Sequence, residues 1–243
     1  MTSKPDLAAF QLTDARNEWL LLAQSAVAAG RGDDAFEFMR ALAGTVGDGD
    51  LTVPERNCLA ATAKQVIAAR RAAWRSLAAG PAVVETYRKQ IAGEFESIGL
   101  EFVSFLEGVL LPRSHGGGAE SRVQYLGMSG DLYAALAEGV GGKGYDGRAA
   151  ASYEEAIHLA DGSLLPTHPV RLGLVLNYAV CMYEILKDQK KACELAKKAF
   201  DDALSKLDQL DEASYKDVTL IMQLLRDNLT AWTGGSSSAP DER

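Results

Sequence analysis

The sequence predicts an all-α fold in which nine antiparallel helices stack as helical hairpins. Nearly every segment places apolar residues at helical spacing, and no segment shows the convincing apolar–polar alternation of a strand. The connections between the long helical segments are short, and short connections place consecutive helices antiparallel to each other. Together these observations predict a stack of hairpins without a sheet.

The first four helices are bounded by glycine, proline and capping residues. Gly30-Arg-Gly32 joins the first two helices, Thr52-Val-Pro-Glu55 has the pattern of a capping box, and Gly80-Pro81 ends the third helix. The fourth helix ends at Pro112. The expected helices run from about Thr13 to Ala29, Asp33 to Ala43, Thr52 to Ala79, and Ala82 to Leu110.

Five further helices follow His115-Gly-Gly-Gly118, a break that we expect to separate two halves of the chain. Thr167-His-Pro169, Asp188 and Ser214 are the expected N-terminal caps of the last three helices. These five helices are expected from about Ala119 to Glu138, Tyr145 to Ala160, His168 to Leu186, Asp188 to Leu207, and Ser214 to Trp232.

Composition and charge narrow the classes of function. The 243 residues are 47% hydrophobic and 24% charged, as in ordinary globular proteins, and the net charge of −8 argues against a nucleic-acid partner. Cys58, Cys181 and Cys193 are too scattered for a disulfide framework. No apolar run approaches the roughly 20 residues that span a bilayer, and the N-terminus lacks the layout of a signal peptide. We therefore expect a soluble intracellular chain, cytoplasmic and also nuclear, with no membrane partner.

The sequence gives little support for catalysis or for a metal site. His115, His158 and His168 lie far apart and match no metal-ligand spacing. The loop from Gly139 to Gly144 resembles a phosphate-binding loop in composition alone, because it lacks the Gly-Lys-Ser/Thr ending and a preceding strand. We expect no enzyme, no cofactor and no metal.

The stretch from Leu172 to Leu186 is apolar on nearly every side, which predicts a helix buried all round. Asn177 and Glu184 break this pattern and lie two helical turns apart, so that both point the same way. A buried amide or carboxylate needs a hydrogen-bond partner. The partner is either a neighbouring helix or a ligand, and the periodicity alone does not distinguish the two.

A row of cations in the third helix is the second polar feature. Lys64, Arg71 and Arg75 lie at i, i+7 and i+11, within roughly 40° of one face. Most such rows are solvated faces with acidic neighbours. Arginine forks and a lysine ammonium are also what an anion site requires. Opposite an Asn/Glu stripe, this row predicts a groove that holds an anion and an extended peptide. Leu220, Leu224 and Ala231 of the last helix, with Asn228 beside them, would form its third wall.

The residues from Pro166 to Val180 and from Ser214 to Trp232 closely resemble the signature of 14-3-3 proteins, and Ala69–Arg75 and Tyr87–Ile91 resemble it less tightly. The resemblance implies a nine-helix fold, a cup-shaped dimer, and binding of phosphoserine or phosphothreonine peptides without catalysis. It divides the chain into an N-terminal extension (1–12), a helical domain (13–233) with a dimerisation half (13–112) and a groove half (119–233), and a disordered tail (234–243).

The resemblance also implies the roles of individual residues. Lys64 and Arg71 match phosphate ligands of the family, and Arg75 matches a nearby basic residue. Asn177 and Asn228 match the asparagines that hold the peptide backbone, with Glu184 beside them. The apolar side of the groove is matched by Gly173, Leu176, Val180, Leu220, Leu224 and Trp232.

The phosphate pocket departs from the family pattern. Ala134 and Ala135 replace an Arg-Tyr pair that completes the pocket in the family, and Gly127 replaces a usual lysine. Losing two charged hydrogen bonds weakens binding by roughly 3–6 kcal/mol, or about a hundredfold to ten-thousandfold. We further expect Asp131 to pair with Lys64 and so to weaken the basic patch.

The dimer contacts are partly retained. In the family the first helix packs on the third and fourth helices of the other subunit. Arg31 and Glu94 keep one ion pair of that interface, and Tyr87 belongs to the same surface. Asp34 is expected to lose its partner, because Gln90 stands where the family has lysine. The third-to-fourth helix connection is also about ten residues shorter than usual. Homodimers and heterodimers are both compatible with this pattern.

Three functions remain open at this point. The first is a phosphopeptide adaptor of the 14-3-3 type with an incomplete phosphate pocket. The second is a phosphate-independent scaffold or dimerisation partner. The third is a tetratricopeptide-like module that clamps acidic C-termini through Lys64, Arg71 and Arg75, since two segments resemble pieces of such repeats.

Overall fold

The structure is a computed structural model that describes residues 4–77, 80–114 and 118–234. Within these ranges the chain contains helices and no strand, as the sequence predicts. The long helices are α1 (Ala15–Ala28), α2 (Gly32–Thr45), α3 (Val53–Ser76), α4 (Ala82–Phe105), α6 (Ala119–Gly139), α7 (Tyr145–Ser163), α8 (Pro169–Glu184), α9 (Gln189–Leu204) and α10 (Glu212–Trp232). No helix in the described part of the chain is both long and apolar enough to cross a membrane.

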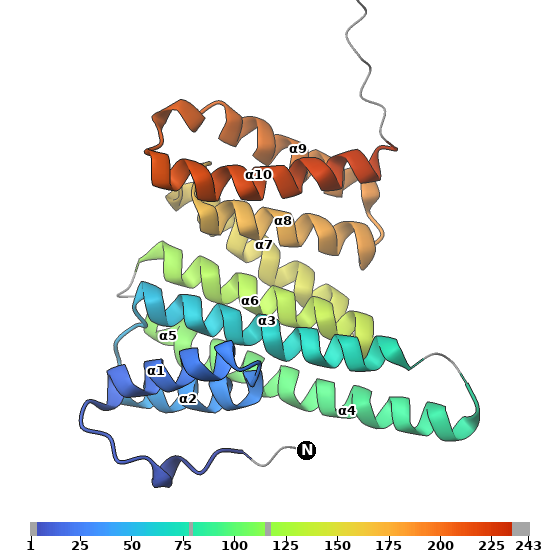
Figure 1. The fold of residues 1–243 in the computed structure, drawn as a ribbon. Helices are drawn as coiled ribbons and strands as arrows, with labels where there is room; N and C mark the ends of the chain where they lie inside the picture. The colour runs from blue at the N-terminus through green and yellow to red at the C-terminus, as the bar shows by residue number, and fades with distance from the viewer. Residues whose placement is uncertain (1–3, 78–79, 115–117, 235–243) are drawn as a thin grey trace, which may run out of the picture.

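The helices stack in order along the molecule, from α1 and α2 at one end to α9 and α10 at the other (Figure 1). Helix α3 contacts α1, α2, α4 and α6, and α8 contacts α6, α7, α9 and α10. The hydrophobic core is divided along the same direction of the stack. One large cluster runs from α1 to α8, and a second cluster joins α8, α9 and α10 through residues such as Val175, Val218 and Leu225.

Several predicted caps are confirmed. The Thr52 N–H donates to the Glu55 carboxylate at 2.7 Å, and the Lys191 N–H donates to Asp188 at 3.2 Å. His168 caps α8, where its Nδ1 accepts from the Val170 N–H at 3.3 Å. Each side chain satisfies a backbone donor that the first turn of a helix leaves without a partner.

Several predicted helix ends are wrong, among them the ends at Ala160 and Leu207, since α7 runs to Ser163 and α9 ends at Leu204. The last helix is capped by Asp211 and not by Ser214, because the aspartate accepts the Ser214 N–H at 2.8 Å and its charge favours the helix N-terminus. The third helix ends at Ser76, before the predicted Ala79, which lies outside the described residues. The fourth leaves α-geometry at Leu106.

The change of geometry after α4 has a local cause. Leu106–Leu110 form a π-helical segment, followed by the short α5 (Leu111–Arg113). Pro112 has no N–H to donate and its ring would clash with the carbonyl four residues earlier. A wider turn ahead of the proline relieves that clash.

The N-terminal segment packs back on the first half of the molecule. The Phe10 ring makes edge contacts with Trp19 and Phe38, at centroid distances of 5.7 and 5.6 Å. The Lys4 ammonium lies 2.5 Å from Glu37 and 3.1 Å from Glu101. The hydrogen bonds to these two carboxylates raise the pKa of Lys4. This segment is therefore held on α2 and α4 by apolar and ionic contacts.

A glycine sets the spacing between α6 and α7 at the centre of the stack. A Cβ on Gly130 would lie 2.7 Å from two ring atoms of Tyr153. Tyr153 is itself fully buried, so its ring has no free space to enter. Gly130 thus allows α7 to approach α6 closely beside Asp131, which lies next in the chain.

We therefore expect Gly130→Ala to lower the free energy of unfolding by about 1–3 kcal/mol, because the added methyl group overpacks this contact. Gly162→Ala in α7 is the control, since its Cβ would have nothing within 4 Å. Urea unfolding followed by circular dichroism measures both variants. Equal stability of the two variants would contradict the close packing of Gly130 on Tyr153.

Candidate functional site

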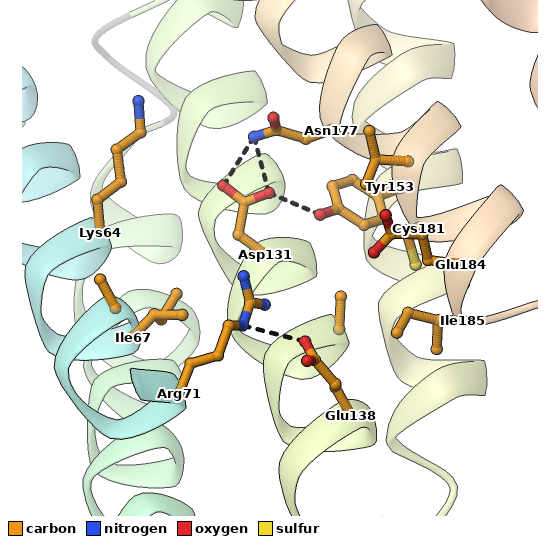
Figure 2. A pocket seen from close by; sticks show the side chains of 13 residues that line it. Lys64, Ile67, Arg71, Asp131, Glu138, Tyr153, Asn177, Cys181, Glu184 and Ile185 are labelled. Carbon is orange, nitrogen blue, oxygen red and sulfur yellow. Dashed lines mark hydrogen bonds and ion pairs between the residues drawn. The ribbon is translucent and has the colours of Figure 1, made fainter. Parts of the chain in front are cut away.

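A cavity of about 290 Å³ opens between α3, α6, α7 and α8 (Figure 2). We call it the central cavity. Its walls come from both halves of the chain, with two cations on α3 facing a polar stripe on α8. The lining residues are Lys64, Ile67, Ala68, Arg71, Asp131, Ala134, Glu138, Tyr153, Asn177, Val180, Cys181, Glu184 and Ile185.

Helical spacing explains which side chains face the cavity. Lys64 and Arg71 are seven residues apart on α3, and Asn177 and Glu184 are seven apart on α8, so each pair lies on one face. The face of α8 that carries Asn177 and Glu184 is partly open, whereas the opposite face, with Leu172 and Ala179, is buried. The prediction that this helix is buried all round is therefore wrong along one stripe.

Asp131 lies at the base of the central cavity and is held by two neutral donors. The Tyr153 hydroxyl donates to one carboxylate oxygen at 2.6 Å. The Asn177 amide nitrogen lies 2.9 and 3.1 Å from the two oxygens. Helices α6, α7 and α8 thus meet at one carboxylate, and the amide nitrogen of Asn177 has an internal partner. The Asn177 amide oxygen accepts no hydrogen bond from the described residues.

Burial raises the pKa of Asp131 to about 6. The hydrogen bonds from Tyr153 and Asn177, together with the charges of Lys64 and Arg71, oppose this rise. Burial likewise raises the pKa of the Tyr153 hydroxyl and, to about 12, that of the Cys181 thiol. Both groups are therefore neutral near pH 7, whereas the pKa of Asp131 lies just below neutrality.

The predicted pair between Asp131 and Lys64 does not form. Lys64 is exposed, and its ammonium has no carboxylate within 4 Å among the described residues. Because Tyr153 and Asn177 already bind the Asp131 carboxylate, the strongly hydrated ammonium gains little by leaving water for it.

Glu138 pairs with Arg71 and Arg75, the two arginines of the basic row, and not with Lys64. The Arg71 Nε lies 3.0 Å from one Glu138 oxygen, and the Arg75 Nε donates to the other at 2.8 Å. Arg75 does not line the central cavity. One glutamate on α6 therefore neutralises part of the basic row, as in a solvated face with acidic neighbours.

Ala134 and Ala135, which replace the Arg-Tyr pair of the family pattern, lie in different surroundings. Ala134 lines the central cavity, whereas Ala135 is fully buried in the core and is not among the lining residues. The apolar wall around Ala134 includes Ile67 and Val180. These side chains offer no hydrogen-bond donor to a ligand.

The predicted apolar side of the groove lies on α8 and α10. Gly173 lines a smaller hollow of about 150 Å³ that shares Lys64, Asp131 and Asn177 with the central cavity. Leu176 and Asn228 are half-buried, Leu220 and Leu224 are exposed, and Trp232 stacks on Tyr183 with ring centroids 4.7 Å apart. None of the predicted α10 residues lines the central cavity itself.

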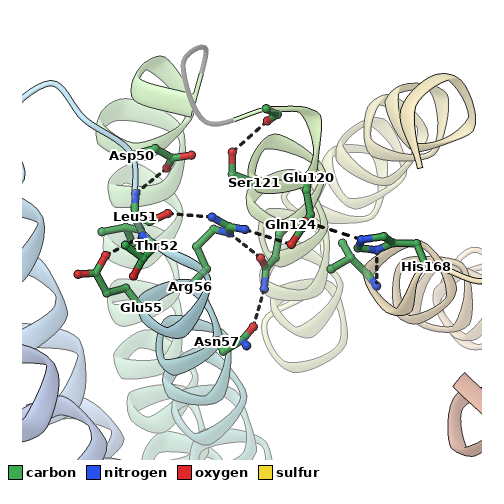
Figure 3. Close-up of polar contacts among 12 residues, drawn as sticks. Asp50, Leu51, Thr52, Glu55, Arg56, Asn57, Glu120, Ser121, Gln124 and His168 are labelled. Atoms are coloured by element: carbon green, nitrogen blue, oxygen red, sulfur yellow. Dashed lines mark hydrogen bonds and ion pairs between the residues drawn. The ribbon is translucent and has the colours of Figure 1, made fainter. Parts of the chain in front are cut away.

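A buried arginine joins the two halves beside these hollows (Figure 3). Arg56 of α3 donates to the Leu51 carbonyl at 2.8 Å and, on α6, to Glu120 and Gln124, both at 3.0 Å. The His168 Nε2 lies 3.7 Å from the other Glu120 oxygen. Arg56 thus ties the start of α3 to α6, close to the N-terminus of α8.

The residues assigned to the dimer surface lie on α2 and α4 and at the turn before α2. Arg31 pairs with Asp34 of the same chain, which leaves the expected loss of the partner of Asp34 on the other subunit untested. Glu94 accepts from the Gln90 amide at 3.2 Å. Tyr87 is 54% exposed. A single chain does not test an inter-subunit contact, and the dimer residues remain a prediction.

Tyr153, Ile67 and Cys181 line the cavity but were absent from the sequence prediction. Ile67 lies three residues after Lys64, and Cys181 lies four after Asn177, so helical spacing would have found both. No sequence signal identified Tyr153. Within the described ranges, no group of three or more His, Cys, Asp or Glu side chains is placed to hold a metal ion.

The sequence of the chain is similar to known proteins of one family. The sequence model of the family described as 14-3-3 protein matches residues 22–233. The 14-3-3 protein 7 of Solanum lycopersicum is 44% identical over 94% of this chain and 97% of the relative. The 14-3-3-like protein GF14-12 of Zea mays is 43% identical over 93% and 92%. The checkpoint signal transducer rad24 of Schizosaccharomyces pombe is 44% identical over 91% and 86%.

The raised pKa of Asp131 predicts a specific pH dependence of stability. The folded chain holds this proton up to about pH 6, whereas an unfolded aspartate loses it near pH 4. Proton uptake therefore stabilises the fold as the pH falls through 6, and the gain levels off below about 4. Between pH 8 and pH 5 the native chain should gain about 1–2 kcal/mol relative to Asp131→Asn. Urea titrations of both proteins at each pH measure this difference, and parallel curves would contradict the raised pKa.

Proposed function

Because this chain belongs to the 14-3-3 protein family, we propose that it is a non-catalytic adaptor that binds phosphoserine or phosphothreonine peptides through an incomplete phosphate pocket. The observation that carries the proposal is the central cavity, where Lys64 and Arg71 of α3 face Asn177 of α8. A peptide whose anionic group lies beside the two cations would bring its backbone N–H within reach of the Asn177 amide oxygen, which can accept it.

The peptide would lie along the open stripe of α8 and the exposed face of α10. Gly173, Leu176 and Val180 supply apolar contacts on α8, and Leu220 and Leu224 extend them on α10. Exposed leucines at helical spacing, on a helix that packs against α8, suit the wall of a peptide groove. Asn228 and Trp232 would contact the same segment, and Glu184 would meet its basic side chains.

The pocket is incomplete because few donors are free to bind phosphate. Ala134 supplies no hydrogen bond, Ala135 is buried, and Glu138 is shared by Arg71 and Arg75. Lys64 is the one cation of the row without a carboxylate within 4 Å in the described part of the chain. These features support a phosphate affinity below that of a site with a full set of basic ligands.

The same features favour a second candidate, a scaffold or dimerisation partner that has lost regular phosphopeptide binding. Leu21 on α1 and Val83 and Tyr87 on α4 are 61%, 75% and 54% exposed, which suits a surface covered by another subunit. That subunit would be a second copy of the chain or another member of the family, with Arg31 and Glu94 at the rim. The tetratricopeptide-like clamp loses its support, since the 14-3-3 family covers residues 22–233.

We propose that the adaptor works in the cytoplasm and also in the nucleus, on phosphorylated client proteins and without membrane or nucleic-acid partners. The supports are its membership of a family that includes a checkpoint signal transducer and the net charge of −8. Clients would be recognised by the phosphorylated segment that enters the groove.

The test is a calorimetric titration with a phosphoserine peptide that a conventional family member binds, and with its unphosphorylated serine twin. The phosphoserine peptide should bind more tightly, and Lys64→Gln should weaken that binding about tenfold, since one charged hydrogen bond is lost. Lys190→Gln on α9 is the control, because Lys190 pairs with Glu194 away from the cavity. Equal affinity of the native chain for the two peptides would end the proposal.

A further inference from the structure

The charges that line the central cavity do not match a doubly charged ligand. Two cations, Lys64 and Arg71, face three carboxylates, Asp131, Glu138 and Glu184. The Arg71 Nε pairs with Glu138 at 3.0 Å, so part of its charge is already balanced. Among the lining residues this leaves one cation, Lys64, with no carboxylate within 4 Å. One free ammonium matches one unit of negative charge on a ligand.

Asp131 cannot move away from an incoming anion. Its side chain is partly buried, and Tyr153 and Asn177 hold both of its oxygens in place. The charged groups that face it are Lys64 and Arg71 of α3, while α7 and α8 present neutral donors. A ligand in the cavity therefore meets a fixed negative charge, and the repulsion is twice as large for a dianion as for a monoanion.

The hydrogen-bond donors lead to the same conclusion. The Lys64 ammonium and the terminal nitrogens of Arg71 are the charged donors of the cavity, and Ile67, Ala134 and Val180 form a wall without donors. Two donor groups can serve the two oxygens of a carboxylate. The third oxygen of a phosphate would face the apolar wall, and an anionic oxygen without a partner is costly there.

We propose that the central cavity is matched to a side-chain carboxylate, so that the groove takes an unphosphorylated acidic segment at least as well as a phosphorylated one. The ligand class is an extended peptide whose glutamate or aspartate occupies the place of the phosphoresidue. The carboxylate binds Lys64 and Arg71, and the methylene stem of a glutamate packs on Ile67 and Val180. The inference rests on the proposed function in that the groove binds an extended peptide.

The experiment uses the full chain and four peptides that differ at one position, which carries phosphoserine, glutamate, glutamine or serine. In calorimetric titrations, the glutamate peptide should bind at least as tightly as the phosphoserine peptide. It should also bind about tenfold more tightly than the glutamine peptide. Phosphoserine binding tenfold tighter than glutamate binding would overturn the inference and leave the proposed function standing. Four equal affinities would overturn both.

Two variants change the charge of the cavity by different routes. Ala134→Arg adds a cation to the wall, and Glu138→Gln releases Arg71 and Arg75 from their shared partner. Each should move the ratio of phosphoserine to glutamate affinity at least fivefold toward phosphoserine. Glutamine has nearly the same size as the glutamate that it replaces at position 138. The test therefore does not depend on whether an arginine fits at position 134.

Glu155→Gln on α7 is the matched control for Glu138→Gln. Glu155 is exposed and pairs with Arg122 outside the central cavity, so the same loss of charge there should leave the ratio unchanged. An unchanged ratio in Glu138→Gln, or an equal shift in Glu155→Gln, would show that the cavity charges do not select the ligand.

Discussion

The site depends on one partly buried carboxylate, Asp131, and on the two neutral groups that bind it. A partly buried carboxylate loses part of its hydration, and the hydrogen bonds from Tyr153 and Asn177 to its two oxygens offset that loss. Because the three residues come from α6, α7 and α8, the same contact fixes how these helices sit around the cavity. The absence of a side chain at Gly130 lets Tyr153 come close enough to donate.

This arrangement lets Asn177 of the α8 stripe bind a neighbouring helix and still offer an acceptor to a ligand. The nitrogen of the Asn177 amide is committed to Asp131, which leaves its oxygen toward the groove. Glu184 lies two turns further along the same stripe and is exposed at the rim. A polar residue on an otherwise apolar helix can therefore bind a neighbouring helix with one end and remain available to a ligand with the other.

On the α3 side of the cavity, Glu138 of α6 binds the arginines of the basic row. It sits between Arg71 and Arg75 and pairs with both, so the row of three cations behaves as one free ammonium and one shared pair. The α3 wall that carries this row is tied to the groove half near its N-terminus by Arg56, through Glu120 and Gln124. The position of the cavity between the two halves, and the pairing that leaves Lys64 as its one free cation among the described residues, both follow from contacts between α3 and α6.

The sequence by itself determined the helices, most of their caps and the faces on which Lys64, Arg71, Asn177 and Glu184 lie, because spacing along one helix sets which residues share a face. Resemblance to a family added the roles. Only the tertiary structure decided the partners: that Asp131 binds Tyr153 and Asn177 instead of Lys64, and that Arg75 pairs with Glu138 outside the cavity. These choices depend on distances between helices that are far apart in sequence, and periodicity within a helix carries no information about them.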